Sequence, residues 1–94
     1  MYAVERRYDG VTNPTEAARQ VKEGFIPLLR DVSGFVAYYW VNAGDGVMVS
    51  TSVFQDQAGE EESTKRAADF VRTNLASLLP NPPQVTAGEV VASA

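Results

Sequence analysis

An alternating pattern of apolar and polar side chains opens the chain and predicts a β-strand over residues 2–8. One face of this strand would carry Tyr2, Val4, Arg6 and Tyr8, and the other Ala3, Glu5 and Arg7. Asp9 and Gly10 follow and end the pattern, because both residue types favour turns. The first element is therefore a short amphipathic strand with an arginine on its more apolar face.

A repeat of apolar residues at three- and four-residue spacing then predicts a helix from Pro14 to about Arg30. Asn13 is the predicted N-cap, and Pro14 stands at the first helical position, where a missing N–H costs little. Pro27 lies inside the repeat and removes a backbone donor. We therefore expect a kink or a tightened turn near residues 24–27.

The stretch from residue 34 to residue 54 is rich in large apolar residues and predicts a hairpin of two strands with its turn at residues 43–46. With uninterrupted pairing from the turn, one face would carry Phe35, Ala37, Tyr39, Val41, Met48, Ser50, Ser52 and Phe54. The other face would carry Val36, Tyr38, Trp40, Val47, Val49, Thr51 and Val53. A slip of one residue would regroup these side chains, but either way both faces are largely apolar.

The remaining elements are a second helix and a last strand. Asp56 is the predicted N-cap, and the acidic run of residues 60–62 is interpreted as a solvated helix entrance, because the helix dipole favours negative charge there. Residues 80–83, Pro-Asn-Pro-Pro, end this helix, and a strand from about Gln84 to Val91 is expected after them. No repeat or linker divides the chain.

The element order β-α-β-β-α-β predicts a single domain over residues 1–94 with an α+β, ferredoxin-like fold: a four-stranded antiparallel sheet with two helices on one face. Two helices cover only one side of such a sheet. Because the hairpin is apolar on both sides, its second face requires another protomer or a ligand. A homodimer formed through the sheet face is the predicted assembly.

The amino-acid composition limits the kinds of catalytic and metal site that the chain can form. The 94 residues include no cysteine and no histidine, which excludes thiolate and imidazole metal ligands and the commonest general base. The net charge of −4 argues against nucleic acid as a partner. No segment approaches the roughly 20 apolar residues that span a bilayer, and no signal peptide is recognised, so we expect a cytoplasmic protein without a membrane partner.

Several segments resemble the dimeric α+β barrel proteins, in particular the antibiotic-biosynthesis-monooxygenase-like group. The resemblance rests on residues 25–29, residues 34–36, the strand through Val49 and Val53, and the run Phe54-Gln55-Asp56-Gln57-Ala58. Phe54 stands where many members carry tryptophan, and Ser63 stands near a position that is often histidine. The likeness spans nearly the whole chain and implies an uncharacterised member of that group.

This resemblance implies a dimeric α+β barrel with a cavity between sheet and helices or inside the barrel. Some members are oxygenases of aromatic polyketides that need no metal or flavin, and others degrade haem. Because this chain has no histidine, haem degradation through a histidine ligand is not expected. We expect no cofactor and no metal.

Candidate site residues come from the hairpin and the first strand. A cavity floor for a small hydrophobic or aromatic ligand is predicted from side chains that combine small size, apolar walls and a few hydroxyls, namely Phe35, Ala37, Tyr39, Ser50, Ser52 and Phe54. Candidate catalytic residues are Tyr39, Trp40, Asn42 and Arg7, with Arg6 as a further electrostatic candidate. The alternative interpretation is that the small residues only allow a partner sheet to approach.

Two functions follow. The first is a cofactor-independent monooxygenase in which an electron-rich aromatic or polyketide-type substrate itself activates oxygen. The second is a non-catalytic dimeric module that binds a small hydrophobic ligand or a partner protein. The sequence offers no convincing base for the first hypothesis, and the second requires nothing beyond the predicted fold.

Overall fold

The computed structural model describes residues 1–94 and contains four strands and two long helical segments. The elements in chain order are β1 (Tyr2–Tyr8), α1 (Pro14–Gln20), η1 (Val21–Phe25), α2 (Ile26–Arg30), β2 (Phe35–Gly44), β3 (Val47–Phe54), α3 (Gln57–Phe70), η2 (Val71–Leu75) and β4 (Gln84–Glu89). Here η1 and η2 are π-helical turns that continue the helices beside them. The strands form one antiparallel sheet in the order β2-β3-β1-β4, which confirms the ferredoxin-like prediction.

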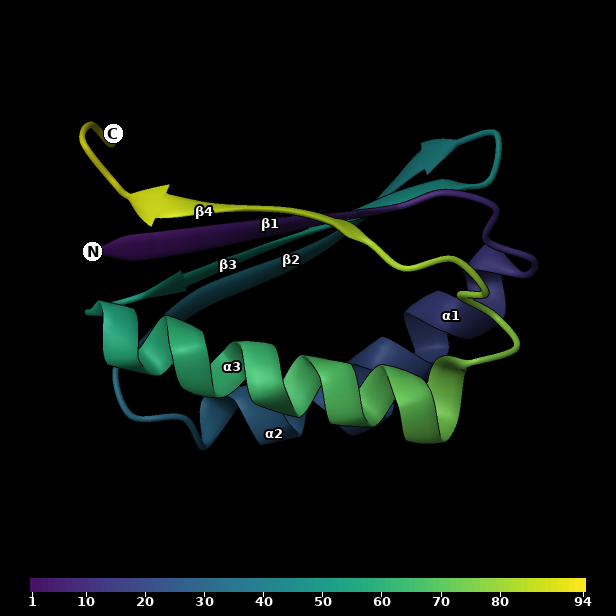
Figure 1. Cartoon of the computed structure of the whole chain (residues 1–94), viewed down its shortest axis with the longest axis horizontal. Helices are drawn as coiled ribbons and strands as arrows, with labels where there is room; N and C mark the ends of the chain where they lie inside the picture. Colours follow the sequence, from purple (N-terminus) through teal and green to yellow (C-terminus); the bar gives the residue numbers. More distant parts are fainter.

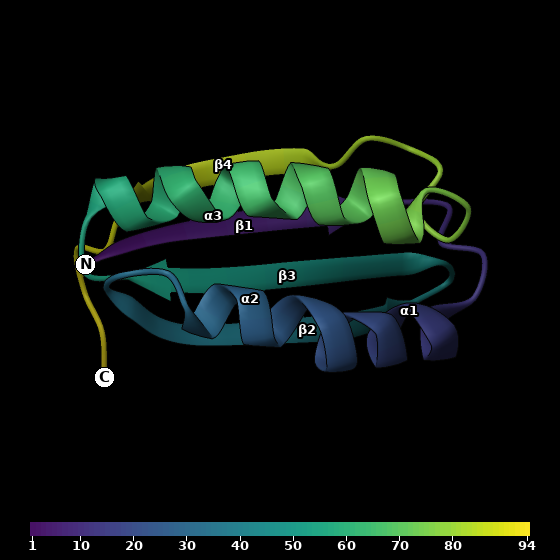
Figure 2. The same ribbon diagram turned by 90° about the horizontal axis from the view of Figure 1, so that it is seen from below.

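The helices all lie on one side of the sheet and leave the other side uncovered (Figure 1). Seen from the helix side, α3 runs along β1 and β4, whereas α1 and α2 run along β2 and β3 (Figure 2). The core fills the layer between them and includes Val4, Val21, Phe25, Leu29, Met48, Phe54 and Leu75. The covered face of the sheet is called the helix face below, and the uncovered face is called the open face.

The first helical segment begins as the sequence predicts, but its irregularity is a wider turn at residues 21–25 rather than the expected tightened turn. The Asn13 side chain accepts a hydrogen bond from the Glu16 N–H at 3.2 Å, which confirms the N-cap. The expected irregularity is η1, in which the Ile26 N–H bonds to the Val21 carbonyl. Because Pro27 has no N–H, the α-helical bond to residue 23 cannot form, and a wider turn precedes the proline.

The predicted division of the hairpin side chains is wrong, because β2 contains two irregularities. Pairing starts at Gly44 with Val47, but a shift between Asn42 and Gly44 moves the ladder by one residue. Trp40 then lies opposite Ser50, rather than on the other face from it. A second shift between Phe35 and Ala37 returns Phe35 to the same side as its partner Phe54.

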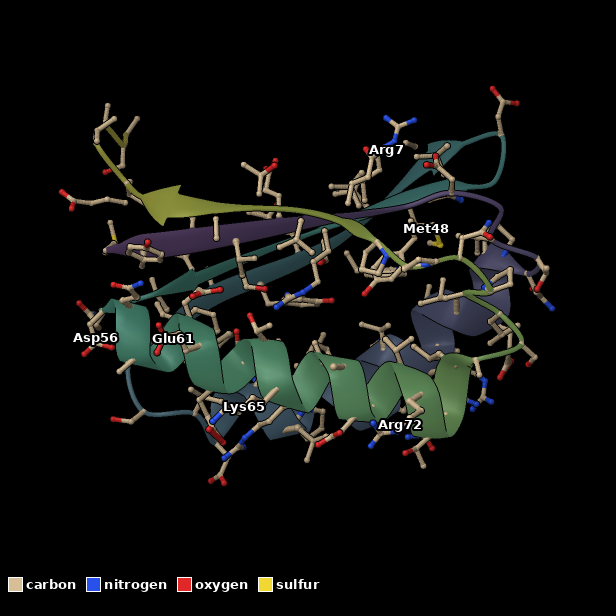
Figure 3. The ribbon with its side chains drawn as sticks, in the orientation of Figure 1. Arg7, Met48, Asp56, Glu61, Lys65 and Arg72 are labelled. Carbon is tan, nitrogen blue, oxygen red and sulfur yellow. The ribbon has the colours of Figure 1, made fainter.

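The two faces therefore have different members from those predicted. The helix face of the hairpin carries Phe35, Tyr38, Trp40, Met48, Ser50, Ser52 and Phe54. The open face carries Ala37, Tyr39, Val41, Val49, Thr51 and Val53. Neighbouring strand β1 contributes Arg7 to the open face, and Figure 3 shows Arg7 projecting away from the helices. Met48 is fully buried on the helix face.

The second half of the chain matches its predicted elements closely. The Asp56 carboxylate accepts a hydrogen bond from the Gly59 N–H at 2.9 Å, as expected of an N-cap. Figure 3 shows Asp56 and Glu61 at the start of α3, where the solvated acidic entrance was predicted. Glu61 and Glu62 are exposed as expected, but Glu60 is buried. Strand β4 ends at Glu89, slightly before the predicted Val91, although the Val90 N–H still bonds to the Met1 carbonyl at 2.8 Å.

Candidate functional site

A small cavity lies between the helix face of the sheet and the two helical segments. Its volume is about 10 Å³, room for a single water molecule. The polar groups that line it come from the sheet and are Arg6, Tyr8, Tyr38, Trp40 and Ser50. The apolar walls come from the helical segments and the residues after them: Val21, Phe25, Ala67, Phe70, Val71, Leu75 and Leu79.

Both π-helical turns face this cavity. Val21 and Phe25 belong to η1, and Val71 and Leu75 belong to η2. A π-helical turn is wider than an α-helical one and is often found at functional sites. Each helical segment therefore departs from regular geometry at the level of the cavity.

Arg6 is the charged group of the site. Only 3% of the residue is exposed, and it belongs to none of the ion pairs in the structure. One guanidinium nitrogen, Nη2, donates a hydrogen bond to the Thr64 hydroxyl at 2.8 Å. Burial lowers the pKa of Arg6, while Tyr8, Tyr38 and Glu60 nearby act in the opposite direction. An arginine carries five N–H donors, so one identified bond leaves much of its capacity for a ligand.

The two tyrosines beside Arg6 are neutral donors rather than bases. Burial raises the pKa of Tyr38 well above its ordinary value, and neighbouring Tyr8 raises it further, against smaller opposing effects of a Ser50 hydrogen bond and the Arg6 charge. Burial also raises the pKa of Tyr8, with Arg6 opposing. Both phenols therefore keep their protons at neutral pH, and neither accepts a proton from a substrate.

Trp40 contributes a ring and an unpaired donor. Its ring centroid lies 5.7 Å from that of Tyr8 at an angle of 49°. The buried Nε1–H of Trp40 has no hydrogen-bond partner, which is uncommon for a buried indole. A polar atom of a ligand in the cavity would satisfy this donor.

A wider groove adjoins the cavity on the other side of Arg6 and Tyr8. It has a volume of about 270 Å³ and lies between α3 and the start of β4. Arg6 and Tyr8 line both spaces, and Thr64, Val71, Pro83 and Val85 complete the groove wall. The guanidinium group therefore borders both the small cavity and the wider groove.

The structure separates the predicted ligand-binding residues. Ser50 lines the cavity, and Ser52 lies beside it with its hydroxyl buried and unpaired. Phe35 and Phe54 pack edge to face at 6.0 Å in the core on the same side. Ala37 and Tyr39 lie on the open face, where Tyr39 is 62% exposed. These six residues therefore do not form one surface.

The predicted catalytic candidates are separated too. Only Trp40 lines the cavity. Asn42 accepts a hydrogen bond from the Gly44 N–H at 3.0 Å and so stabilises the irregular end of β2. Arg7 lies on the open face, where it pairs with Asp9 at 3.3 Å. Tyr39 is on the same open face.

Tyr8 and Tyr38 were missed by the sequence-based prediction, and Arg6 was named only as a further candidate. The available signal was the period of two in β1, which placed Arg6 between Val4 and Tyr8 on one face. Burying an arginine among apolar residues costs free energy. Such an arginine is therefore a stronger indication of function than an arginine on the solvent-exposed face of the strand. For Tyr38, the strand register was required to show that it shares a face with Ser50 and Ser52.

Two further properties concern metals and membranes. No group of three or more acidic, histidine or cysteine side chains is placed to hold a metal ion. None of the helices has both the length and the apolar character required to cross a membrane.

The fold places the chain in a known structural class. No family model and no curated protein matches the sequence. Solved structures do match, and they show that the chain has the ferredoxin-like fold of the antibiotic-biosynthesis-monooxygenase-like proteins. The suspected resemblance is thus confirmed at the level of the fold.

Three of these structures illustrate the range of the class. NE2512 of Nitrosomonas europaea, a protein of unknown function, is 24% identical with a TM-score of 0.79, over 99% of this chain and 91% of its own. A monooxygenase from the gene ActVA-Orf6 of Streptomyces coelicolor, solved with Nanaomycin D, is 20% identical with a TM-score of 0.72, over 98% and 92%. SnoaB, a cofactor-independent oxygenase from Streptomyces nogalater, is 17% identical with a TM-score of 0.65, over 99% and 93%.

Proposed function

We propose that the chain is a cofactor-independent monooxygenase that acts on an electron-rich aromatic or polyketide-type molecule in the cavity beside Arg6. The observation that carries this proposal is a buried arginine without a salt-bridge partner, which lines a mostly apolar cavity together with the unpaired Trp40 Nε1–H. Such a site suits a planar ring system that bears an oxygen anion. The oxygenases among the structural neighbours also support the proposal of an oxygenase activity.

The proposed reaction needs only the substrate and dioxygen. An anthrone-type substrate loses one proton from its ring CH₂ to water and becomes an enolate. The enolate is oxidised by dioxygen: one oxygen atom forms the new carbonyl group, and the other leaves as water with the two hydrogens of the CH₂. Arg6 would stabilise the enolate oxygen and thereby lower the pKa of the substrate, which makes a protein base unnecessary.

Ring binding requires the site to open. The cavity of about 10 Å³ holds one water molecule, whereas an aromatic ring system needs hundreds of Å³. The adjoining groove of about 270 Å³ leads to Arg6 and Tyr8 from solvent. In this proposal the substrate enters from the groove and displaces the Tyr8 ring from Trp40.

The proposed assembly is a homodimer formed through the open face. This face carries Tyr39 and Val41, which are 62% and 48% exposed, together with Val49 and Val53. Exposed apolar side chains grouped on one sheet face are typical of an interface. The cavity lies on the opposite side of the sheet, so dimer formation and substrate binding would use different surfaces.

Oxygen consumption with a panel of anthrone-type compounds tests the activity. The wild-type protein is expected to consume one molecule of dioxygen for each molecule of quinone formed. Arg6→Met should lower the rate by about a hundredfold, as the loss of one stabilising donor does at an oxyanion site. Arg7→Met is the matched control, because Arg7 is the adjacent arginine on the open face, and it should keep the wild-type rate. No consumption across the panel, or full activity of Arg6→Met, would overturn the proposal.

A non-catalytic binding module is the second candidate. It is favoured by the absence of a base among the cavity residues, since burial keeps Tyr8 and Tyr38 protonated by raising the pKa of each. Because Trp40 is the single tryptophan, its fluorescence reports on the cavity alone. Quenching of that fluorescence by an aromatic ligand, without oxygen consumption, would establish the binding module instead.

A further inference from the structure

Arg6, Thr64 and Glu60 form a chain of hydrogen-bonded side chains that joins β1 to α3. The Arg6 Nη2 donates to Thr64 Oγ1 at 2.8 Å, and Thr64 Oγ1 lies 3.0 Å from Glu60 Oε1 and 3.1 Å from the Glu60 carbonyl oxygen. Glu60 is 8% exposed and Arg6 is 3% exposed. Thr64 itself is exposed, so the Arg6-Thr64-Glu60 chain connects two buried charged groups through a residue at the protein surface.

The chemistry of the three groups fixes the direction of the hydrogen bonds. A guanidinium group only donates, and a carboxylate only accepts. The Thr64 hydroxyl therefore accepts from Arg6 and donates to Glu60, whose carboxylate and backbone carbonyl oxygens both lie within hydrogen-bond distance. The Thr64 hydroxyl has no proton left to donate to a ligand. In its contact with Arg6 it is always the acceptor.

The same geometry keeps the acid and the base apart. Glu60 attracts Arg6 electrostatically, but the pair is not among the ion pairs of the structure. If the carboxylate bound the guanidinium directly, it would occupy the donors that face the cavity and would neutralise the charge locally. With Thr64 between them, Glu60 offsets the cost of burying Arg6 while the guanidinium keeps donors for a ligand.

We infer that Thr64 is a positioning residue that holds Arg6 toward the cavity and thereby supports a preference for anionic over neutral aromatic ligands, a preference that the negative charge of Glu60 reduces. This inference rests on the proposed function, because it concerns the same site. It adds two residues of α3 that sequence reasoning did not select. It also assigns Glu60 a role other than membership of the acidic helix entrance.

Binding of a matched ligand pair tests this inference without requiring turnover. The probes are anthraquinone carboxylate and its primary amide, which share a ring system and differ in charge, and the readout is calorimetry together with Trp40 quenching. The wild-type protein should bind the carboxylate more tightly than the amide, as expected of a buried arginine. Arg6→Met should abolish this preference.

The variants at Thr64 and Glu60 should act in opposite directions. Thr64→Val removes the hydroxyl at constant size, and it should reduce the preference for the carboxylate by about tenfold, the value of one hydrogen bond to a charged group, while amide binding stays unchanged. Thr64→Ser restores the hydroxyl and should restore the preference. Glu60→Gln keeps an acceptor for Thr64 but removes the competing charge, so the preference should rise several-fold.

The outcomes separate this inference from the proposed function. Binding of both probes by wild type with equal affinity, or an unchanged preference in Thr64→Val, would overturn the inference and leave an aromatic binding site in place. If both Thr64→Val and Glu60→Gln lower the preference for the carboxylate, the Arg6-Thr64-Glu60 chain has only a structural role. That result would also overturn the inference. Failure of the wild type to bind either probe would overturn the proposed function itself.

Discussion

At the residue scale, two adjacent arginines of one strand have different chemical environments. Arg6 is buried, its pKa is lowered by burial, and its identified partner is a neutral hydroxyl. Arg7 is exposed on the other face and pairs with Asp9. The side-chain period of two in a strand produces this difference. Arg6 is therefore the functional candidate, and Arg7 is a control for every experiment on it.

Tyr38 provides a prediction on alkaline pH. Because burial raises the pKa of Tyr38 above its ordinary value of 10.0, the unfolded chain releases this proton at lower pH than the folded protein does. The contribution of Tyr38 to the free energy of unfolding is thus complete below pH 10. It should be lost above pH 10 by up to about 1.4 kcal/mol for each pH unit.

Urea unfolding at a series of pH values between neutral and alkaline checks this expectation. The free energy of unfolding of Tyr38→Phe should fall less steeply above pH 10 than that of the wild type. Equal slopes for Tyr38→Phe and the wild type would show that the Tyr38 phenol is not buried in the folded protein.

At the element scale, local signals predicted the strands, the helices and their caps. Asn13 and Asp56 are N-caps because each side chain satisfies a free N–H of the first helical turn, a property that can be read from a few neighbouring residues. The irregularity before Pro27 was also predictable, since proline removes a donor wherever it stands. These features depend on residues close together in the chain.

The candidate site was less predictable because it depends on register and on contacts between distant elements. One extra residue near Ala43 brings Ser50 and Ser52 of β3 onto the same face as Trp40 and Tyr38, and pairs Tyr39 with Thr51 on the open face. No local pattern distinguishes such an irregular pairing from an uninterrupted ladder. The contact of Arg6 with Thr64 joins residues 58 positions apart, and it follows from helix docking rather than from either segment alone.

At the scale of the whole molecule, the two sides of the sheet suit two tasks. The helix face encloses the cavity and its polar groups. The open face presents Tyr39, Val41, Val49 and Val53 without cover from this chain (Figure 1). A sheet covered on one side only can be completed by a second sheet. This division supports the proposed homodimer and keeps the cavity clear of the interface.

Charge placed on the open face should break the proposed dimer. The wild type is expected to sediment at twice the chain mass of 10.2 kDa, and the double variant Tyr39→Glu/Val41→Glu as a monomer, because two desolvated carboxylates would oppose association. Leu28→Glu is the control, since Leu28 is 42% exposed on a helix and lies away from this face. A wild-type monomer, or a dimer that persists in the double variant, would contradict this assembly.

The central claim is that an aromatic ligand binds between the sheet and the helices, beside Arg6. A crystal structure of the protein with a hydroxyanthraquinone tests it most directly. We expect the ring system next to Trp40 and Phe25, with one of its oxygens within about 3 Å of the Arg6 guanidinium group. A ligand bound instead on the open face, against Tyr39 and Thr51, would contradict the account.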